Sequence, residues 1–376
     1  MATESLAEAP RHVFYDKLNG LLAESGFDGF VESLCEPHYR EGGRPSIAPG
    51  VYLRMLLIGD FEDLSSQRGI AWRCSDSLSL RKFLGIPLDH ETPDHSSLTK
   101  IGQRLPATIC QQVFQFVLKI AVQKKVLCGK QVGVDSTTLE ANAAMRSIVR
   151  KDNGDDWKTY LRKLAAAEGV EIDNDEDLRR FDQKRRKEGK KKVSNDEWQS
   201  PVDPDARIGQ MKDGRTYLNY KAQHVVDLDS EIVVQADVHH GNSADSQTVI
   251  GSLVDAQLNL DPCSDGVETT DDSIGVITEV AADKEYHANE VLASCRDLHV
   301  RTYIPEREGG DRVWDDKPDA MKDAFHGNVS GCSVRREETC RSVALKWSNA
   351  ASLTSAKPAV LVAHGCEALR MFASVT

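Results

Sequence analysis

The chain has 376 residues, 40% of them hydrophobic and 28% charged, and its formal net charge is −12. This length is enough for two domains of ordinary size, and this composition is typical of a globular protein rather than of a disordered one. The sequence has no apolar run near the ~18 residues that a membrane-spanning helix needs, and its first residues lack the basic-then-apolar layout of a signal peptide.

The first third of the chain, residues 1–125, is predicted to be a helical domain. Apolar residues recur at helical spacing from residue 14 onward, with Gly and Pro loops between the periodic segments. We expect a third helix over Phe61–Trp72, a helix start after Pro93, and a long apolar helix over Ile109–Val126. Several short helices favour a DNA-binding domain, although they suit a protein-interaction domain equally well.

Residues 126–328 are predicted to form a second domain that carries an insertion. The β-branched run Gln131–Asp135 reads as its first strand. A highly charged segment then covers about residues 146–205, with nine Lys or Arg between Arg179 and Lys192. This basic run is either a solvated helix face or an arm that contacts phosphates.

Strands and helices alternate after the insertion. The predicted elements are a hairpin of strands Thr216–Asp227 and Ile232–Val238, helix Ala244–Leu260, strand Ile274–Ala282, helix His287–Leu298 and strand Val300–Ile304. An opening hairpin followed by alternating elements predicts an α/β fold with a mixed sheet flanked by helices.

The charge is unevenly distributed along the chain. Residues 201–328 hold 11 basic and 26 acidic side chains, whereas residues 329–376 hold 6 and 3. The acidic total argues against nonspecific binding to nucleic acid, but local basic clusters can still contact phosphate. The weak DNA-binding candidates are the basic residues of the helical domain, Arg68, Arg73, Arg81, Lys82 and Lys100.

Two carboxylates are the main candidates for chemistry. Asp135 and Asp283 each end an apolar strand, where an ionised carboxylate is costly unless it is solvated, paired or bound to a cation. Together on neighbouring strands they would suit Mg²⁺ or Mn²⁺, and two such ions could clamp the oxygens of a phosphodiester. The alternative is that each Asp only caps the turn or helix that follows its strand.

Other motifs give weaker signals. There is no GxGxxG, P-loop or GxSxG sequence. His239-His240 fits a surface turn better than a metal site, and His95 with its neighbouring serines fits helix capping better than a nucleophile–base pair. The nine cysteines include no CxxC pair, so we expect reduced thiols in a cytoplasmic protein and neither a zinc finger nor a disulfide scaffold.

A series of motifs resembles the DDE-type transposases of bacterial insertion sequences. The matching stretches, in chain order, are Gly133–Ala143, Asp203–Arg207 with Lys212–Gly214, Tyr220–His224, Ala282–Tyr286 and Tyr303–Pro305. In the fourth stretch Glu285 stands where the family has Gly. The helical region from Gly43 to Leu105 is similar to the domain that precedes the transposase cores.

The resemblance implies an RNase H-like core in which Asp135 and Asp283 are catalytic, metal-binding carboxylates. It implies two Mg²⁺ or Mn²⁺ ions, double-stranded DNA at the element ends as substrate, and a homo-oligomer on that DNA. It also implies a third carboxylate, a Glu within a Val-Glu-Arg-Ser-Phe-Ala-His-like motif on a late helix. That motif is absent, and Trp347–Thr354 stands in its expected place.

A change of reading frame would account for the missing motif. Residues 329–376 contain eight Ala, seven Ser and no Asp. Permitted codons for Trp347–Thr354, read one frame over, include Val-Glu-Arg-Ser-Phe-Ala-His in that order, and the same frame makes 328–332 compatible with Arg-Gln-Arg-Leu. We therefore expect a frameshift near residues 326–329 and an aberrant tail at 329–376. If the frame is native, Glu337 or Glu338 is the fallback third ligand.

The sequence thus predicts a DNA transposase in a defective copy, in which strand cleavage and transfer are weak or lost. The alternatives are a noncatalytic DNA-binding remnant that occupies element ends, or an RNase H-like nuclease that acts without transposition. A plain interaction protein is the remaining alternative.

Overall fold

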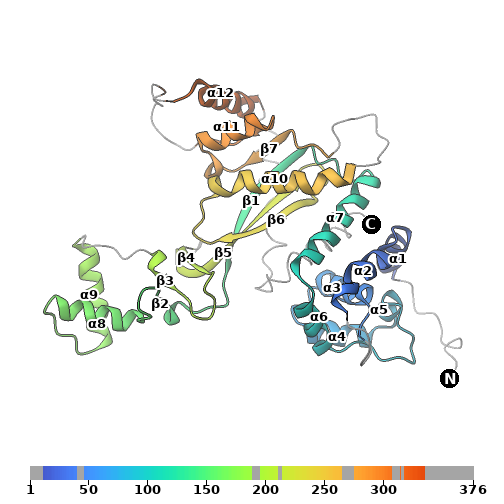
Figure 1. Ribbon diagram of the computed structural model, residues 1–376, viewed down its shortest axis with the longest axis horizontal. Helices are drawn as coiled ribbons and strands as arrows, with labels where there is room; N and C mark the ends of the chain where they lie inside the picture. Colours follow the sequence, from blue (N-terminus) through green and yellow to red (C-terminus); the bar gives the residue numbers. More distant parts are fainter. Residues whose placement is uncertain are drawn as a thin grey trace.

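The N-terminal part of the computed structural model is a cluster of helices (Figure 1). The structure describes residues 12–39, 46–188, 195–210, 214–264, 275–306, 314 and 317–334. The helices of this part are α1 (Val13–Glu24), α2 (Phe27–Cys35), α3 (Pro49–Phe61), α4 (Gln67–Asp76), α5 (Leu78–Phe83), α6 (His95–Arg104) and α7 (Ala107–Gln123). A 3₁₀ turn, η2 (Glu36–His38), follows α2.

The predicted helix over Phe61–Trp72 is wrong, because two helices divide this stretch. Helix α3 ends at Phe61, and Asp63 takes a left-handed backbone conformation with a φ of 51°. The hydroxyl of Ser66 then accepts a hydrogen bond from the Gly69 N–H at 3.1 Å and caps the start of α4. A local cap and a backbone reversal therefore override the apolar periodicity of the segment.

The second part contains a six-stranded sheet with the strand order of an RNase H-like fold. Strands β6 (Val233–His240), β5 (Thr216–Asp227), β1 (Gln131–Glu140), β7 (Glu279–Ala282) and β8 (Arg301–Tyr303) lie side by side in this order. The pairs among β6, β5 and β1 are antiparallel, whereas β7 and β8 run parallel to β1. Short strand β4 (Arg207–Gln210) also pairs with β5. The predicted fold class, a helical region followed by a mixed sheet flanked by helices, is confirmed.

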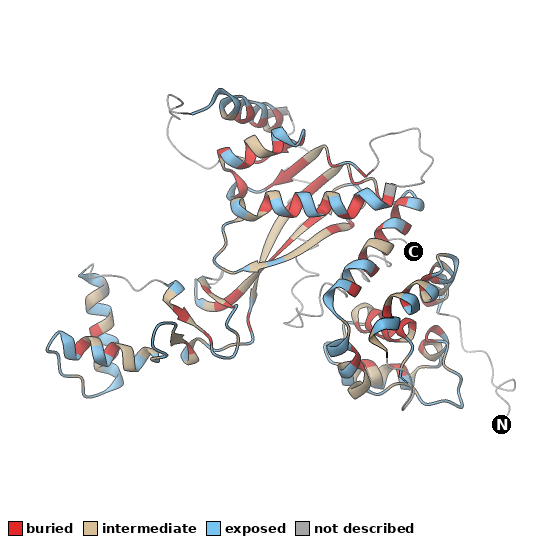
Figure 2. Ribbon diagram, in the orientation of Figure 1, coloured by how far each residue is buried: buried red, intermediate tan, exposed pale blue. Residues whose placement is uncertain are grey.

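Helices cover the sheet and join it to the N-terminal part. Helix α10 (Asp245–Ser264) packs against β5, β6 and α7, while α11 (Asn289–Asp297) and α12 (Asp319–Val334) pack against β8 and each other. The Gln115 side chain of α7 donates a hydrogen bond to Asn259 of α10 at 3.0 Å. One continuous apolar core runs through both parts, and Figure 2 shows the buried residues on the strands and inner helix faces.

Strand β7 is shorter than the prediction Ile274–Ala282. Ile274 lies outside the described residues, and pairing with β1 begins only at Glu279. Residues 275–278 are bonded instead to the loop before β1, where the Thr278 N–H donates to the Lys130 carbonyl at 3.0 Å. The apolar run therefore begins several residues before the strand that the structure contains.

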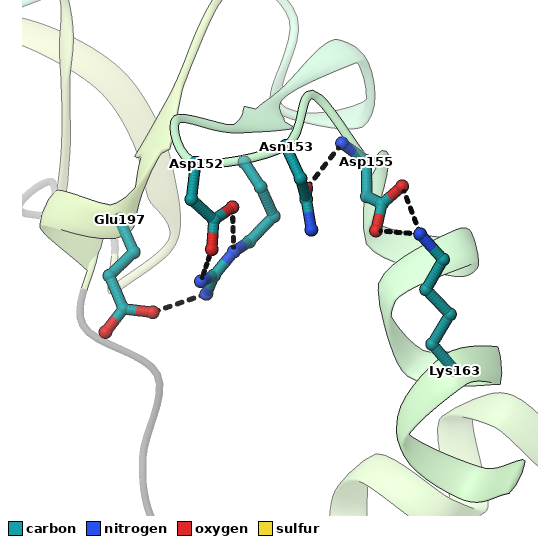
Figure 3. A network of polar contacts seen from close by, with 6 residues as sticks. Asp152, Asn153, Asp155, Lys163 and Glu197 are labelled. Atoms are coloured by element: carbon teal, nitrogen blue, oxygen red, sulfur yellow. Dashed lines mark hydrogen bonds and ion pairs between the residues drawn. The ribbon is translucent and has the colours of Figure 1, made fainter. Parts of the chain in front are cut away.

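The charged insertion forms an arm at the end of β1 (Figure 1). It contains η3 (Met145–Ser147), β2 (Val149–Arg150), α8 (Trp157–Ala167), α9 (Asp175–Lys187), η4 (Asn195–Glu197) and β3 (Trp198–Gln199). Arg150 is paired with Asp152 and Glu197, and Lys163 is paired with Asp155 at 2.6 Å (Figure 3). The arm also has a small apolar cluster of its own around Ile148 and Trp198.

No single helix among the described residues is long and apolar enough to cross a membrane. Helices α6 and α7 meet that criterion only when taken together, and they are bent by 94° relative to each other.

Helix α12 is fixed to the last strand by a buried asparagine. Asn328 is 2% exposed. Its side chain accepts a hydrogen bond from the Ile304 N–H at 2.9 Å and donates one to the Ile304 carbonyl at 2.8 Å. The side chain thus replaces the strand partner that the backbone of Ile304 would otherwise lack.

Replacing Asn328 with Ala should lower the free energy of unfolding by about 2 kcal/mol, because two buried backbone groups lose their partners. Asn328→Asp should be at least as destabilising as Ala, because it buries a carboxylate opposite the Ile304 carbonyl. Urea denaturation followed by circular dichroism measures the change. The exposed Asn153→Ala is the control, and a loss no greater than in this control would show that the paired hydrogen bonds do not stabilise α12.

Candidate functional site

Asp135 lies inside β1. The sequence-based prediction that it ends the strand is therefore wrong. Strand β1 continues to Glu140 because β5 pairs with it as far as Asn219. Pairing with β7, in contrast, stops at Val134. Asp135 is half-buried, and one of its oxygens accepts a hydrogen bond from the Ser136 N–H at 2.7 Å. Asp135 therefore directly follows the last residue of β1 that pairs with β7, but it does not end β1.

Asp283 directly follows β7 and is exposed. Its side chain accepts a hydrogen bond from the Glu285 N–H at 2.7 Å and caps the short 3₁₀ turn η5 (Lys284–Tyr286). The capping role that the sequence left open is thus real for this residue. A carboxylate oxygen has several acceptor positions, so capping does not exclude a ligand on the same side chain.

The sheet places the two aspartates next to each other. Val134 of β1 is in register with Ala282 of the parallel strand β7, and each aspartate is the residue that follows. The two positions chosen from the sequence therefore both lie directly after the last residue pair of β1 and β7.

A second polar group lies beside them, where β1 and β5 meet the start of α10. The Ser136 hydroxyl donates to Asp245 Oδ1 at 2.6 Å, and the Lys221 ammonium donates to the same oxygen at 3.1 Å. Lys221 also donates to the Ser243 carbonyl at 2.7 Å. The side chains of Lys221 and Asp245 are 14% and 17% exposed, so this ion pair is largely shielded from water.

Tyr286, the last residue of η5, lies near both acidic groups. It is 1% exposed, and no described residue meets the geometry of a hydrogen bond with its hydroxyl. Burial raises the pKa of this hydroxyl well above the usual range for Tyr, and the nearby carboxylates of Asp245, Asp135 and Asp283 raise the pKa further, whereas Ser136 lowers it. The hydroxyl therefore stays protonated and is a donor directed at an acidic environment.

The other sequence candidates have structural roles or none that the contacts define. Asp94 caps α6 beside His95, as the capping interpretation required. His240 contacts the Asp205 carbonyl at 2.9 Å at the end of β6. His224, in contrast, stands directly opposite Asp135 in β5, a neighbour that the sequence reasoning missed.

No three His, Cys, Asp or Glu side chains within the described ranges lie close enough together to hold one metal ion. The fallback ligands Glu337 and Glu338 lie outside those ranges. Asp135 and Asp283 thus remain candidates, and no third acidic ligand accompanies them within the described part of the chain.

The five basic candidates of the helical part differ in whether their side chains already contact other described residues. Arg73 pairs with Glu62 at 2.5 Å, Lys82 lies 3.7 Å from Asp16, and Arg81 donates to the Pro87 carbonyl at 2.8 Å. Exposed Arg68 contacts the His95 ring at 3.3 Å, and Lys100 is exposed on α6. Arg68, Arg81 and Lys100 thus make no ion pair with any described carboxylate, and Arg81 is already held by the backbone carbonyls of Pro87 and His90.

Two transposase family models match this chain. Residues 4–104 match the family described as "Transposase domain (DUF772)", and residues 169–357 match the "Transposase DDE domain". The second match includes Asp283 and begins after Asp135. Comparison with curated proteins gives no match.

One solved structure is similar, described as "Mos1 transposase paired-end complex with left transposon end". It is 9% identical, 81% of each chain is covered, and the TM-score is 0.21. The fold assignment therefore rests on the strand order and not on this comparison. Because the DDE-domain match spans half of the chain and follows a helical transposase domain, the protein belongs to the DDE transposase family.

Proposed function

We propose that this chain is a DNA transposase of an insertion sequence, built for metal-dependent strand cleavage and transfer, in a copy that has lost its third catalytic carboxylate. The observation that supports the proposal is the register of β1 with the parallel strand β7, in which the residues just before Asp135 and Asp283 are paired. Family membership alone would not select these two residues among the 59 acidic side chains.

The donor set fits a divalent cation of the Mg²⁺ class. Both side chains supply hard oxygen donors, and the exposure of Asp283 leaves the position open to solvent and substrate. Asp135 and Asp283 would hold the ions, which supply electrostatic stabilisation of the attacking and leaving oxygens when bound. The chain itself contributes rigidity, because Asp135 is fixed within a paired strand and Asp283 within a capped turn.

A change of reading frame near residues 326–329 would account for the missing third carboxylate. Asn328 fits its place, since both of its side-chain hydrogen bonds are made to Ile304. Helix α12 continues beyond it to Val334. The lost frame would carry the Glu of the Val-Glu-Arg-Ser-Phe-Ala-His-like motif, and loss of one member of a catalytic unit costs orders of magnitude in rate.

DNA binding and assembly are further parts of the proposal. The helical region around α4 and α6 would contact the element ends, and an intact relative would act as a homo-oligomer on two ends. If only this binding survives, the chain is a noncatalytic remnant that occupies element ends. An RNase H-like nuclease without end specificity would instead cleave unrelated DNA equally well.

The cleavage proposal is tested by repairing the frame. The nucleotide sequence across codons 320–376 should show a second frame that reads through the Glu motif, and the repaired protein should cleave DNA carrying the flanking ends when Mg²⁺ is added. Asp135→Asn and Asp283→Asn in the repaired protein should each lower the rate by about 10³-fold or more. The present chain should cleave weakly or not at all.

Two results would contradict this prediction. A second frame interrupted by stop codons, or lacking the Glu, would mean that residues 329–376 are native. Robust Mg²⁺-dependent cleavage by the present chain would mean that two carboxylates suffice. Glu231→Gln, in the turn between β5 and β6, is the matched control for the loss of one carboxylate and should leave the rate unchanged.

DNA binding by the helical part is tested through its salt dependence. The double variant Arg68→Ala/Lys100→Ala should reduce the slope of log K against log salt by about 2, because each phosphate contact contributes about 0.9. Fluorescence anisotropy with the same flanking DNA measures the slope. Lys124→Ala is the control, since Lys124 is already paired with Glu24 at 2.8 Å. An unchanged slope in the double variant would exclude this face.

A further inference from the structure

We infer that Asp245 is a positioning residue of the two-aspartate site, which it orders through Ser136 and Lys221. The inference rests on the proposed function, because it needs Asp135 and Asp283 to bind a divalent cation. Asp245 has no counterpart among the three carboxylates that the family resemblance implies. It begins α10, far from both aspartates in sequence, and the fold brings it to β1.

Ser136 is the link between the two acidic groups. Its backbone N–H donates to Asp135 at 2.7 Å, and its hydroxyl donates to Asp245 at 2.6 Å. Successive side chains of a strand point to opposite faces, so Asp245 reaches Asp135 through this residue and not by direct contact. Fixing the Ser136 side chain therefore fixes the peptide that orients the Asp135 carboxylate.

Lys221 holds Asp245 in the orientation that Ser136 needs. The ammonium group donates to the same oxygen, Oδ1, and to the backbone carbonyl of Ser243 in the loop before α10, so the carboxylate is fixed between α10 and β5. Its positive charge also offsets the third negative charge near the site. Without it, three carboxylates in a partly buried place would repel one another.

The Tyr286 hydroxyl connects the two acidic groups. It is buried, it lies beside Ser136, and it is in the field of Asp245, Asp135 and Asp283. Tyr286 also follows Asp283 in η5, so one short turn brings it to both acidic groups.

The experiment measures Mn²⁺ binding to the full chain from the electron paramagnetic resonance signal of free Mn²⁺. Asp245→Asn and Ser136→Ala should each raise the dissociation constant about 10-fold or more, as loss of outer-shell partners does in metal sites. Ser136→Thr keeps the hydroxyl and should restore binding to near the wild-type value. Asp135→Asn and Asp283→Asn should abolish the same binding.

Asp237→Asn is the matched control. Asp237 accepts a hydrogen bond from Ser252 of α10 at 2.6 Å, so it makes the same kind of link between sheet and helix away from the site. This variant should lose thermal stability to a similar extent as Asp245→Asn but keep wild-type Mn²⁺ affinity. If Asp245 has only a structural role, both variants should keep wild-type Mn²⁺ affinity.

The outcomes separate the inference from the proposed function. If Asp135→Asn abolishes binding but Asp245→Asn and Ser136→Ala bind as wild type, the positioning role is wrong and the two-aspartate site stands. If wild type binds no Mn²⁺, or Asp135→Asn and Asp283→Asn change nothing, the site and the inference both fail. If Asp245→Asn does not fold, the comparison of Ser136→Ala with Ser136→Thr decides the question.

Discussion

The parallel pairing of β1 with β7 is the constraint on which the candidate site depends. Val132 and Val280, which are in register on one face, are at most 1% exposed, and Ala281, on the other face, is 7% exposed. Side chains buried on both faces of a parallel pair leave little freedom to shift the register. The positions that follow Val134 and Ala282 are consequently fixed by this register.

Placing two carboxylates together has an electrostatic cost that the surroundings must offset. The segment that contains Asp283 and Asp245 is the most acidic of the chain, and Lys221 is a cation that contacts Asp245. Carboxylates that are close together favour the binding of a cation. A divalent ion removes this repulsion, which is why the same arrangement that is unfavourable alone suits metal-dependent chemistry.

The sequence predicted the elements better than the contacts between them. Thr216–Asp227 has the predicted bounds, because the turn at 228–230 ends the strand where the sequence places it. Asp135 was assigned to a strand end since the apolar run stops there, although β5 carries β1 further. Asp245 was recognised only as a helix start. Its bonds to Ser136 and Lys221 join three elements that are distant in sequence, and no local pattern contains such information.

The described fold does not depend on the proposed third carboxylate. The described core is completed by α12, which bonds to Ile304 through Asn328 and continues to Val334. The strands of the sheet, the residues of the described apolar core and the two aspartates all precede Asn328 in the chain. A change of frame after it would remove a ligand without removing a strand or the elements that hold Asp135 and Asp283. Such a chain would fold and keep its helical N-terminal part while losing strand cleavage, which is the combination expected of a remnant that still occupies DNA.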